Sequence, residues 1–108
     1  MSKLLKFSTI AAAAVLVAAT STIAKADSLT IVSWGGAYTK SQVEAYHKPY
    51  TAKTGITINS EDFSGGLAEV KAQVEAGNVT WDLVDVELSD AIRGCDEGLL
   101  ESIDPSIL

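Results

Sequence analysis

The sequence predicts an α/β fold, a three-layer parallel sheet with helices on both faces, of which this chain supplies the opening part. Three apolar runs of strand length, at 28–33, 56–60 and 82–86, alternate with segments whose apolar residues recur at helical spacing. Glycines and short polar loops separate these runs. Such alternation is typical of a parallel sheet, because each return to the same edge of the sheet needs a crossover helix.

The first helix is expected over 38–53, after the glycine turn that ends the first strand. Its inner face is expected to hold three apolar residues, Val43, Tyr46 and Tyr50. Pro49 lies inside this helix, removes a backbone donor and crowds the carbonyl of Ala45, so a kink or a weak last turn is expected. His47 falls on the polar side of the helix, where a solvated surface position is favoured over a catalytic one.

Two further helices follow the second and third strands. The second helix is expected over 67–76 and ends at the glycine that follows it. Ser89 is expected to be the N-cap of a third helix that stops at Gly98, with Asp90 favourably placed in its first turn. This third helix is expected to turn three residues inward, Ala91, Ile92 and Cys95. Pro105 has the position of one more helix start.

Residues 1–26 have the three parts of a secretory signal peptide. A positive start with two lysines precedes an apolar run over 7–19, and Ala24-Lys25-Ala26 is an A-x-A cleavage site. The run is shorter than the roughly 20 apolar residues that a membrane span needs, so cleavage after Ala26 is favoured over a membrane anchor. The predicted mature segment is therefore 27–108, exported to the periplasm.

The mature segment is strongly acidic. All fourteen Asp and Glu but only five of the eight Lys and Arg lie beyond residue 26, so its net charge is −9 against −6 for the whole sequence. This charge gives no electrostatic reason to bind nucleic acid or an anionic membrane, and it weakly favours cationic ligands. Cys95 is the only cysteine and His47 the only histidine, so no zinc site, no cofactor and no disulfide within the chain are expected.

The first candidate ligand-binding loop follows the first strand. Gly35 and Gly36 permit positive φ and a close approach of a ligand to the backbone. Trp34 and Tyr38 offer flat apolar faces suited to an alkyl chain or a cation. A tight turn with two aromatic residues packed in the core is an equally weighted alternative.

The second candidate loop follows the third strand and holds Glu87, Ser89 and Asp90. Carboxylates suit an ammonium group, whereas backbone N–H groups at a helix start suit an anion. If the strand order is 2-1-3, the two loops flank the point where open α/β sheets bind ligands. The alternatives are ordinary helix capping for Ser89 and Asp90 and a solvated loop acid for Glu87.

Several segments, in this order and spacing, resemble an extracellular solute-binding protein of an ABC transporter, of the spermidine/putrescine-binding type. No single segment is specific, but together they cover nearly the whole chain. The resemblance rests on the signal peptide and on the segments 29–36, 51–56, 81–86 and 94–101.

This resemblance implies a periplasmic monomer with two α/β lobes that closes on a small solute and delivers it to a membrane permease. Residues 27–108 would then be the N-terminal part of the first lobe, with the second lobe absent. The family pattern places Trp34, Gly35, Gly36 and Tyr38 in the cleft, together with three residues of the second loop, Glu87, Ser89 and Asp90. A polyamine-like ligand is favoured. Members of the polyamine branch often have a proline-serine pair after the third strand, whereas this sequence has Val86-Glu87-Leu88-Ser89-Asp90 there, and this difference weakens the case for a polyamine.

Two alternatives of other classes remain open at this point. An exported α/β enzyme is disfavoured because the sequence has no G-x-S-x-G elbow, no phosphate-binding loop and no recognisable nucleophile–histidine spacing. A non-functional truncated remnant, unable to hold ligand alone, is the stronger alternative.

Overall fold

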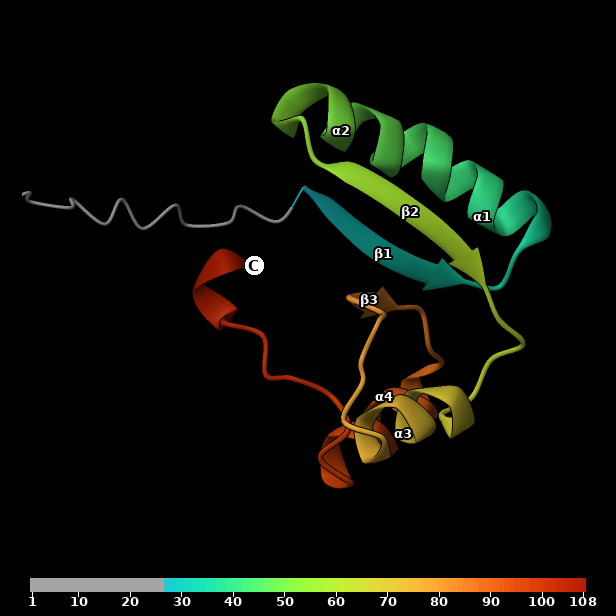
Figure 1. The fold of residues 1–108 in the computed structure, drawn as a ribbon, viewed down its shortest axis with the longest axis vertical. Coiled ribbons are helices and arrows are strands. Elements are labelled where there is room, and N and C mark those ends of the chain that lie inside the picture. The colour runs from blue at the N-terminus through green and yellow to red at the C-terminus, as the bar shows by residue number, and fades with distance from the viewer. Residues whose placement is uncertain (1–26) are drawn as a thin grey trace, which may run out of the picture.

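The computed structural model describes residues 27–108, so the predicted signal peptide at 1–26 lies outside the described residues. Three parallel strands form one sheet in the order β2-β1-β3, with bounds β1 (Ser28–Ser33), β2 (Thr57–Asp62) and β3 (Leu83–Val84). β1 is paired on both sides, as Figure 1 shows. The predicted α/β fold with a parallel sheet is confirmed, and the strand order 2-1-3, which the sequence left as a condition, is the one found.

Helices cover both faces of the sheet and make three layers (Figure 1). One helical segment crosses the first face without a break and consists of α1 (Gly36–Gln42), the π-helical η1 (Val43–His47) and α2 (Lys48–Thr54). The opposite face carries α3 (Ala68–Glu75) and α4 (Leu88–Asp96), and a short 3₁₀ helix, η2 (Pro105–Ile107), follows. Within residues 27–108, no helix has the length and apolar character to cross a bilayer.

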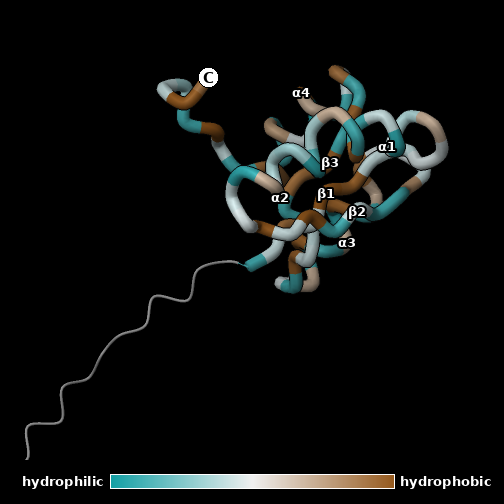
Figure 2. Tube along the Cα trace, turned by 90° about the horizontal axis from the view of Figure 1, so that it is seen from above, coloured by the Kyte–Doolittle hydropathy of each residue, from teal (hydrophilic) through white to brown (hydrophobic). Residues whose placement is uncertain are grey.

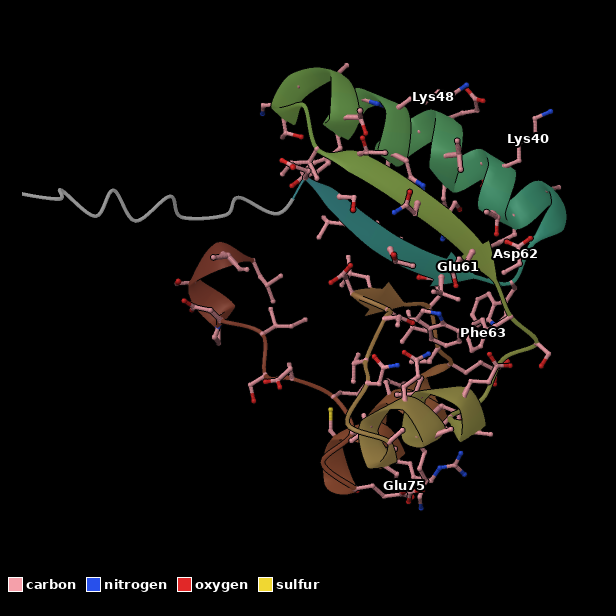
Figure 3. The ribbon with its side chains drawn as sticks, viewed as in Figure 1. Lys40, Lys48, Glu61, Asp62, Phe63 and Glu75 are labelled. Carbon is pink, nitrogen blue, oxygen red and sulfur yellow. The ribbon has the colours of Figure 1, made fainter. Side chains whose placement is uncertain are left out.

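The buried apolar core gathers around β1 and the segment that leads into α3. Four apolar residues are almost fully buried, namely Val32, Phe63, Leu67 and Val70. Figure 2 shows the hydrophobic colour of β1 in the middle of the molecule, with hydrophilic and hydrophobic segments mixed around it. Phe63 meets Trp81 edge to face with ring centroids 5.6 Å apart, and the Trp81 indole donates to Glu61 Oε2 at 2.9 Å. In Figure 3, Glu61 and Phe63 lie where β2 ends.

The first helical segment differs from the predicted regular helix at its centre. The Lys48 N–H donates to Val43 O, five residues back, which is the hydrogen bond of a π turn. Pro49 follows at once and has no N–H to donate, so the wider turn accommodates the proline without breaking the helix. The irregular turn therefore lies before Pro49, whereas the last turn, where a kink or weakening was expected, belongs to the α-helical α2.

The π turn also corrects the predicted inner face of this helix. His47 is buried, with 8% of its surface exposed, whereas Tyr46 is 69% exposed and Tyr50 40% exposed. The expectation that His47 is solvated and the two tyrosines point inward was therefore wrong. The extra residue in the π turn shifts the following positions around the helix axis, so a count at regular helical spacing selects the wrong residues.

The start of α4 also differs from the prediction. The helix begins at Leu88 with Glu87 as N-cap, and Ser89 is already inside the first turn. Ser89 is therefore not the N-cap, and the side chain of Glu87 makes no capping hydrogen bond. Asp90 does lie in the first turn, as expected.

The inner face of α4 is formed by a glycine. Gly94 is buried, whereas Ile92 is 56% exposed and Cys95 is exposed, so the expectation that these two pack inward was wrong. A Cβ at Gly94 would lie 3.0 Å from Leu100 Cδ1 and 3.4 Å from Leu67 Cδ2. The absent side chain lets these leucines approach the helix, and this contact fixes which face points inward.

Beyond α4, the side chain of Asp104 accepts a hydrogen bond from the Ser106 N–H at 2.8 Å and caps η2. The hydrogen bond from the Ser106 backbone lowers the pKa of the Asp104 carboxyl below its usual value, because it stabilises the charged form. The expected helix start at Pro105 is present as this single 3₁₀ turn.

Candidate functional site

The candidate site lies at the carboxyl edge of β1 and β3. In the parallel register Ile31 pairs with Leu83 and Val32 with Val84, so Ser33 and Asp85 come next on the two strands. The Asp85 N–H donates to Val32 O at 2.9 Å and continues this ladder. The chain leaves β1 for β2 on one side and later reaches β3 on the other, so the strand order reverses here, as it does where open α/β sheets bind ligands.

The first candidate loop is held by a chain of hydrogen bonds that starts at Gly35. The Gly35 N–H donates to Thr39 Oγ1 at 2.8 Å, and the Thr39 hydroxyl donates to Asp62 Oδ1 at 3.0 Å. Gly35 has φ +83°, and a Cβ there would lie 3.0 Å from Asp62 Oδ2. Figure 3 labels Asp62 at the end of β2, near the start of α1. Gly35 therefore serves the turn itself, and its N–H is already used within the protein.

Gly36 differs from its neighbour in its surroundings. It also has positive φ, +58°, but a Cβ at this position would meet nothing within 4 Å. Its backbone thus borders open space at the start of α1. Of the two glycines, only Gly36 leaves room for another molecule to approach.

Trp34 and Tyr38 form an aromatic pair next to these glycines. Their ring centroids are 5.2 Å apart and their planes are inclined by 55°. Both rings keep much of their surface in solvent, since Trp34 is 38% and Tyr38 50% exposed. A Cβ built on Gly65 would lie 3.2 Å from Trp34 Nε1, so the backbone of the 64–66 loop packs against the indole edge. The pair is an exposed wall supported from behind, and not part of the buried core.

The second candidate loop is more open than the first. Glu87 and Ser89 are exposed, whereas Asp90 is half-buried and accepts a hydrogen bond from Arg93 Nη2 at 2.8 Å. Within the part of the chain that the structure describes, no hydrogen bond or ion pair links these three residues to Trp34 or Tyr38. The sheet thus starts both loops from one edge, but the structure brings together only the residues of the first loop.

Sequence reasoning missed Asp85, which lies between the two loops. Its Oδ2 accepts hydrogen bonds from Ser33 Oγ at 2.7 Å and from Gln42 Nε2 at 2.6 Å. These contacts join the ends of β1 and β3 to α1. The available signal was an acidic residue inside an apolar strand run, at 82–86, where a side chain facing only other apolar groups would not be charged.

A groove lies along the α1 side of the sheet and reaches Asp85. It has a volume of about 650 Å³. Its walls are mainly apolar and are formed by Leu29, Ile31, Ala45, Tyr46, Tyr50, Ile58 and Leu83. His47 also lines the groove, and its buried Nδ1 has no hydrogen-bond partner. Over residues 27–108, no group of three or more His, Cys, Asp or Glu side chains is placed to hold a metal ion.

A parallel sheet with a reversal of strand order, helices on both faces and ligand-accessible loops at its carboxyl edge is the architecture of a lobe of a periplasmic binding protein. A model of the bacterial extracellular solute-binding protein family matches residues 45–107. The chain belongs to this family, which is one of binding proteins and not of enzymes.

Individual relatives agree with this assignment. The γ-aminobutyric acid-binding protein of Pseudomonas aeruginosa PAO1 is 45% identical over 83 residues, 77% of this chain and 24% of that protein. The crystal structure of MotA from A. tumefaciens B6 with glucopine is 34% identical, with a TM-score of 0.70, over 75% of this chain and 25% of that one. AgtB from A. tumefaciens R10, in complex with agropinic acid, is 40% identical, with a TM-score of 0.69, over 74% and 25% of the two chains.

The chain spans about a quarter of the length of these relatives. The resemblance to solute-binding proteins is thereby confirmed at the level of the family. Its finer part, the spermidine/putrescine type, is not confirmed, since the relatives are described with γ-aminobutyric acid and with two other ligands, glucopine and agropinic acid.

Proposed function

We propose that this chain forms the first-lobe part of the periplasmic solute-binding component of an ABC transporter, which captures a small solute and delivers it to a membrane permease. We propose further that the solute carries a protonated amine, with γ-aminobutyric acid as the first candidate. The family and the P. aeruginosa relative support this proposal. As part of it, the chain is exported by cleavage after Ala26, acts as a monomer and needs no cofactor.

The observation that carries the proposal is the adjacent, parallel pairing of β1 and β3. Since the two strands run side by side in the same direction, the loops that begin at Trp34 and Glu87 start from one edge of the sheet. A second lobe facing this edge would complete a cleft, and closure on the ligand would produce the form that a permease recognises.

Within this cleft, Trp34 and Tyr38 are proposed to be the wall for the methylene chain or the ammonium group of the solute. Their exposure and their support by the 64–66 loop favour this assignment. The other residues of the two loops are also proposed to lie at the cleft. They are Gly35 and Gly36 in the first loop and Glu87, Ser89 and Asp90 in the second. Asp90 contributes less charge than the sequence suggests, because Arg93 compensates it.

Titration calorimetry with γ-aminobutyric acid on the complete gene product tests the proposal. Trp34→Ala is expected to weaken binding about tenfold, because a cation over an aromatic face is worth up to about 2 kcal/mol when desolvated. Tyr50→Ala is the matched control, since Tyr50 has similar exposure, 40% against 38%, and lies on α2 away from both loops. Equal affinity in all three proteins would remove Trp34 from the site.

A polyamine remains the second candidate ligand. The net charge of −9 over 27–108 favours a solute with more than one positive charge. Spermidine and putrescine therefore form a second arm of the same calorimetry. Tighter binding of spermidine than of γ-aminobutyric acid would favour the polyamine, and the reverse order would favour the amino acid.

A further inference from the structure

Asp85 has surroundings that set it apart from the other acidic residues. Of the fourteen Asp and Glu side chains, all of which lie in the described segment 27–108, only Asp85 and Asp90 are half-buried and the rest are exposed. Asp90 is paired with Arg93, whereas no Lys, Arg or His of that segment forms an ion pair with Asp85. Asp85 is thus a partly desolvated negative charge without a cation.

Neutral donors hold this carboxylate in one orientation. Ser33 Oγ and Gln42 Nε2 both donate to the same oxygen, Oδ2, at 2.7 and 2.6 Å. Ser33 is almost fully buried, with 1% of its surface exposed, so its hydroxyl is a fixed donor. The other oxygen, Oδ1, accepts no hydrogen bond from these residues and is not sealed from solvent. One oxygen is therefore committed to the fold, and the other remains available.

The position of Asp85 is as informative as its hydrogen bonds. It follows β3 directly and lies beside the end of β1, between the loop that begins at Trp34 and the loop that begins at Glu87. A partly buried charge without a counter-ion costs free energy in the empty protein, and an incoming cation removes that cost. An ammonium group meets this need best, because it donates hydrogen bonds as well as carrying charge.

We propose that Asp85 is the carboxylate that receives the protonated amine of the solute, with Oδ1 as the acceptor and with Ser33 and Gln42 as positioning residues. This inference rests on the proposed function and makes it more specific, since it assigns amine recognition to a residue of the sheet edge. The loop acids Glu87 and Asp90 then have a secondary part in selecting the amine.

The main test compares Asp85→Asn with the wild-type complete gene product by calorimetry with γ-aminobutyric acid. Asparagine keeps the shape and still accepts from Ser33, but it removes the charge. We expect affinity to fall about 10- to 100-fold, as for a hydrogen bond to a charged group. Asp82→Asn is the control, because Asp82 also accepts a hydrogen bond, from the Thr30 N–H at 2.7 Å, but lies before β3, toward the opposite edge of the sheet. Its affinity is expected to stay within about twofold.

A second arm varies the ligand. Butyrate has the carboxylate and the methylene chain of γ-aminobutyric acid but lacks the amine. Wild-type protein is expected to bind butyrate at least about tenfold more weakly, and Asp85→Asn is expected to abolish most of this difference. A wild-type protein that binds both ligands equally would contradict amine recognition at Asp85.

Ser33→Ala keeps the charge and removes one orienting donor, so a loss of a few-fold in affinity is expected, with the preference for the amine retained. Asp85→Asn gives no affinity if it does not fold. In that case the inference is overturned if Ser33→Ala binds γ-aminobutyric acid as tightly as wild type and wild-type protein binds butyrate as tightly as γ-aminobutyric acid. If Asp85→Asn folds and binds like wild type, the inference is wrong while the proposed function stands. If wild-type protein binds neither γ-aminobutyric acid nor a polyamine, the proposed solute class is wrong and the inference with it.

Discussion

At the scale of single residues, the glycine turn shows how backbone geometry prepares the site. Gly35 has positive φ and faces Asp62 so closely that even a methyl group would press on the carboxylate. The pair of glycines after the first strand was enough to predict a turn with unusual backbone angles. The sequence did not reveal that Gly35 gives its N–H to Thr39. That bond is local, and the Thr39 hydroxyl in turn donates to Asp62 on β2, which is distant in sequence.

Gly35→Ala is expected to destabilise the complete gene product by about 1 to 3 kcal/mol, because alanine is strained at φ +83° and its Cβ would lie 3.0 Å from Asp62 Oδ2. Urea denaturation followed by circular dichroism measures this loss. Gly36→Ala is the control, since it has the strained φ, +58°, without the close contact. Its loss is expected to be the smaller of the two, and a larger loss would contradict the role of the Asp62 contact.

At the scale of helices and strands, regular periodicity was a good guide to which elements form and a poor guide to which face they bury. The second helix was predicted closely in its bounds, and two residues of its expected inner stripe, Leu67 and Val70, are buried, but the third, Val74, is 36% exposed. The first helix was not, because the π turn before Pro49 moves His47 inward. Deviations of this kind depend on local hydrogen bonds, which the pattern of apolar residues does not report.

The helix α4 gives a second example, which yields a prediction. Gly94→Val is expected to destabilise the protein by about 2 to 3 kcal/mol, since a branched side chain would enter the space of Leu100 and Leu67. Asp96→Val, an exposed position on the same helix, is the control for the lower helix propensity of valine. Thermal melting of both variants against wild type gives the comparison. Similar melting temperatures for the two variants would show that α4 does not pack tightly through Gly94.

At the scale of the whole molecule, the fold class and the parallel sheet were predictable, whereas the buried faces of two helices and the part of Asp85 were not. Strand–helix alternation was enough to predict the sheet and its parallel direction, and therefore the edge at which the loops begin, whereas the order β2-β1-β3 had been only a condition. Asp85 was not identified, because its significance arises from the register of β1 against β3 and from a glutamine on α1. The acidic residue in an apolar run was a local signal, but its partners on β1 and α1 are distant in sequence, so the pattern alone does not reveal them.

The buried core of residues 27–108 is small for their length, and this leads to a prediction for the segment alone. Four apolar side chains are almost fully buried, while the groove beside α1 leaves Tyr46, Tyr50 and Leu83 exposed. Little burial and a net charge of −9 both oppose a cooperative fold. Residues 27–108 expressed alone are therefore expected to melt broadly by circular dichroism and to bind a hydrophobic dye.

High salt separates the two causes, since it screens charge repulsion but leaves the exposed groove as it is. If the exposed groove is the main cause of the broad melt, adding salt that only screens charge is expected to leave the transition almost as broad and the dye still bound. A steep melt without dye binding at low salt would contradict the prediction and show that this segment is a stable folding unit. Under that outcome the remnant alternative loses its physical basis, because a stable half-lobe would keep both loops and Asp85 at one edge of its sheet.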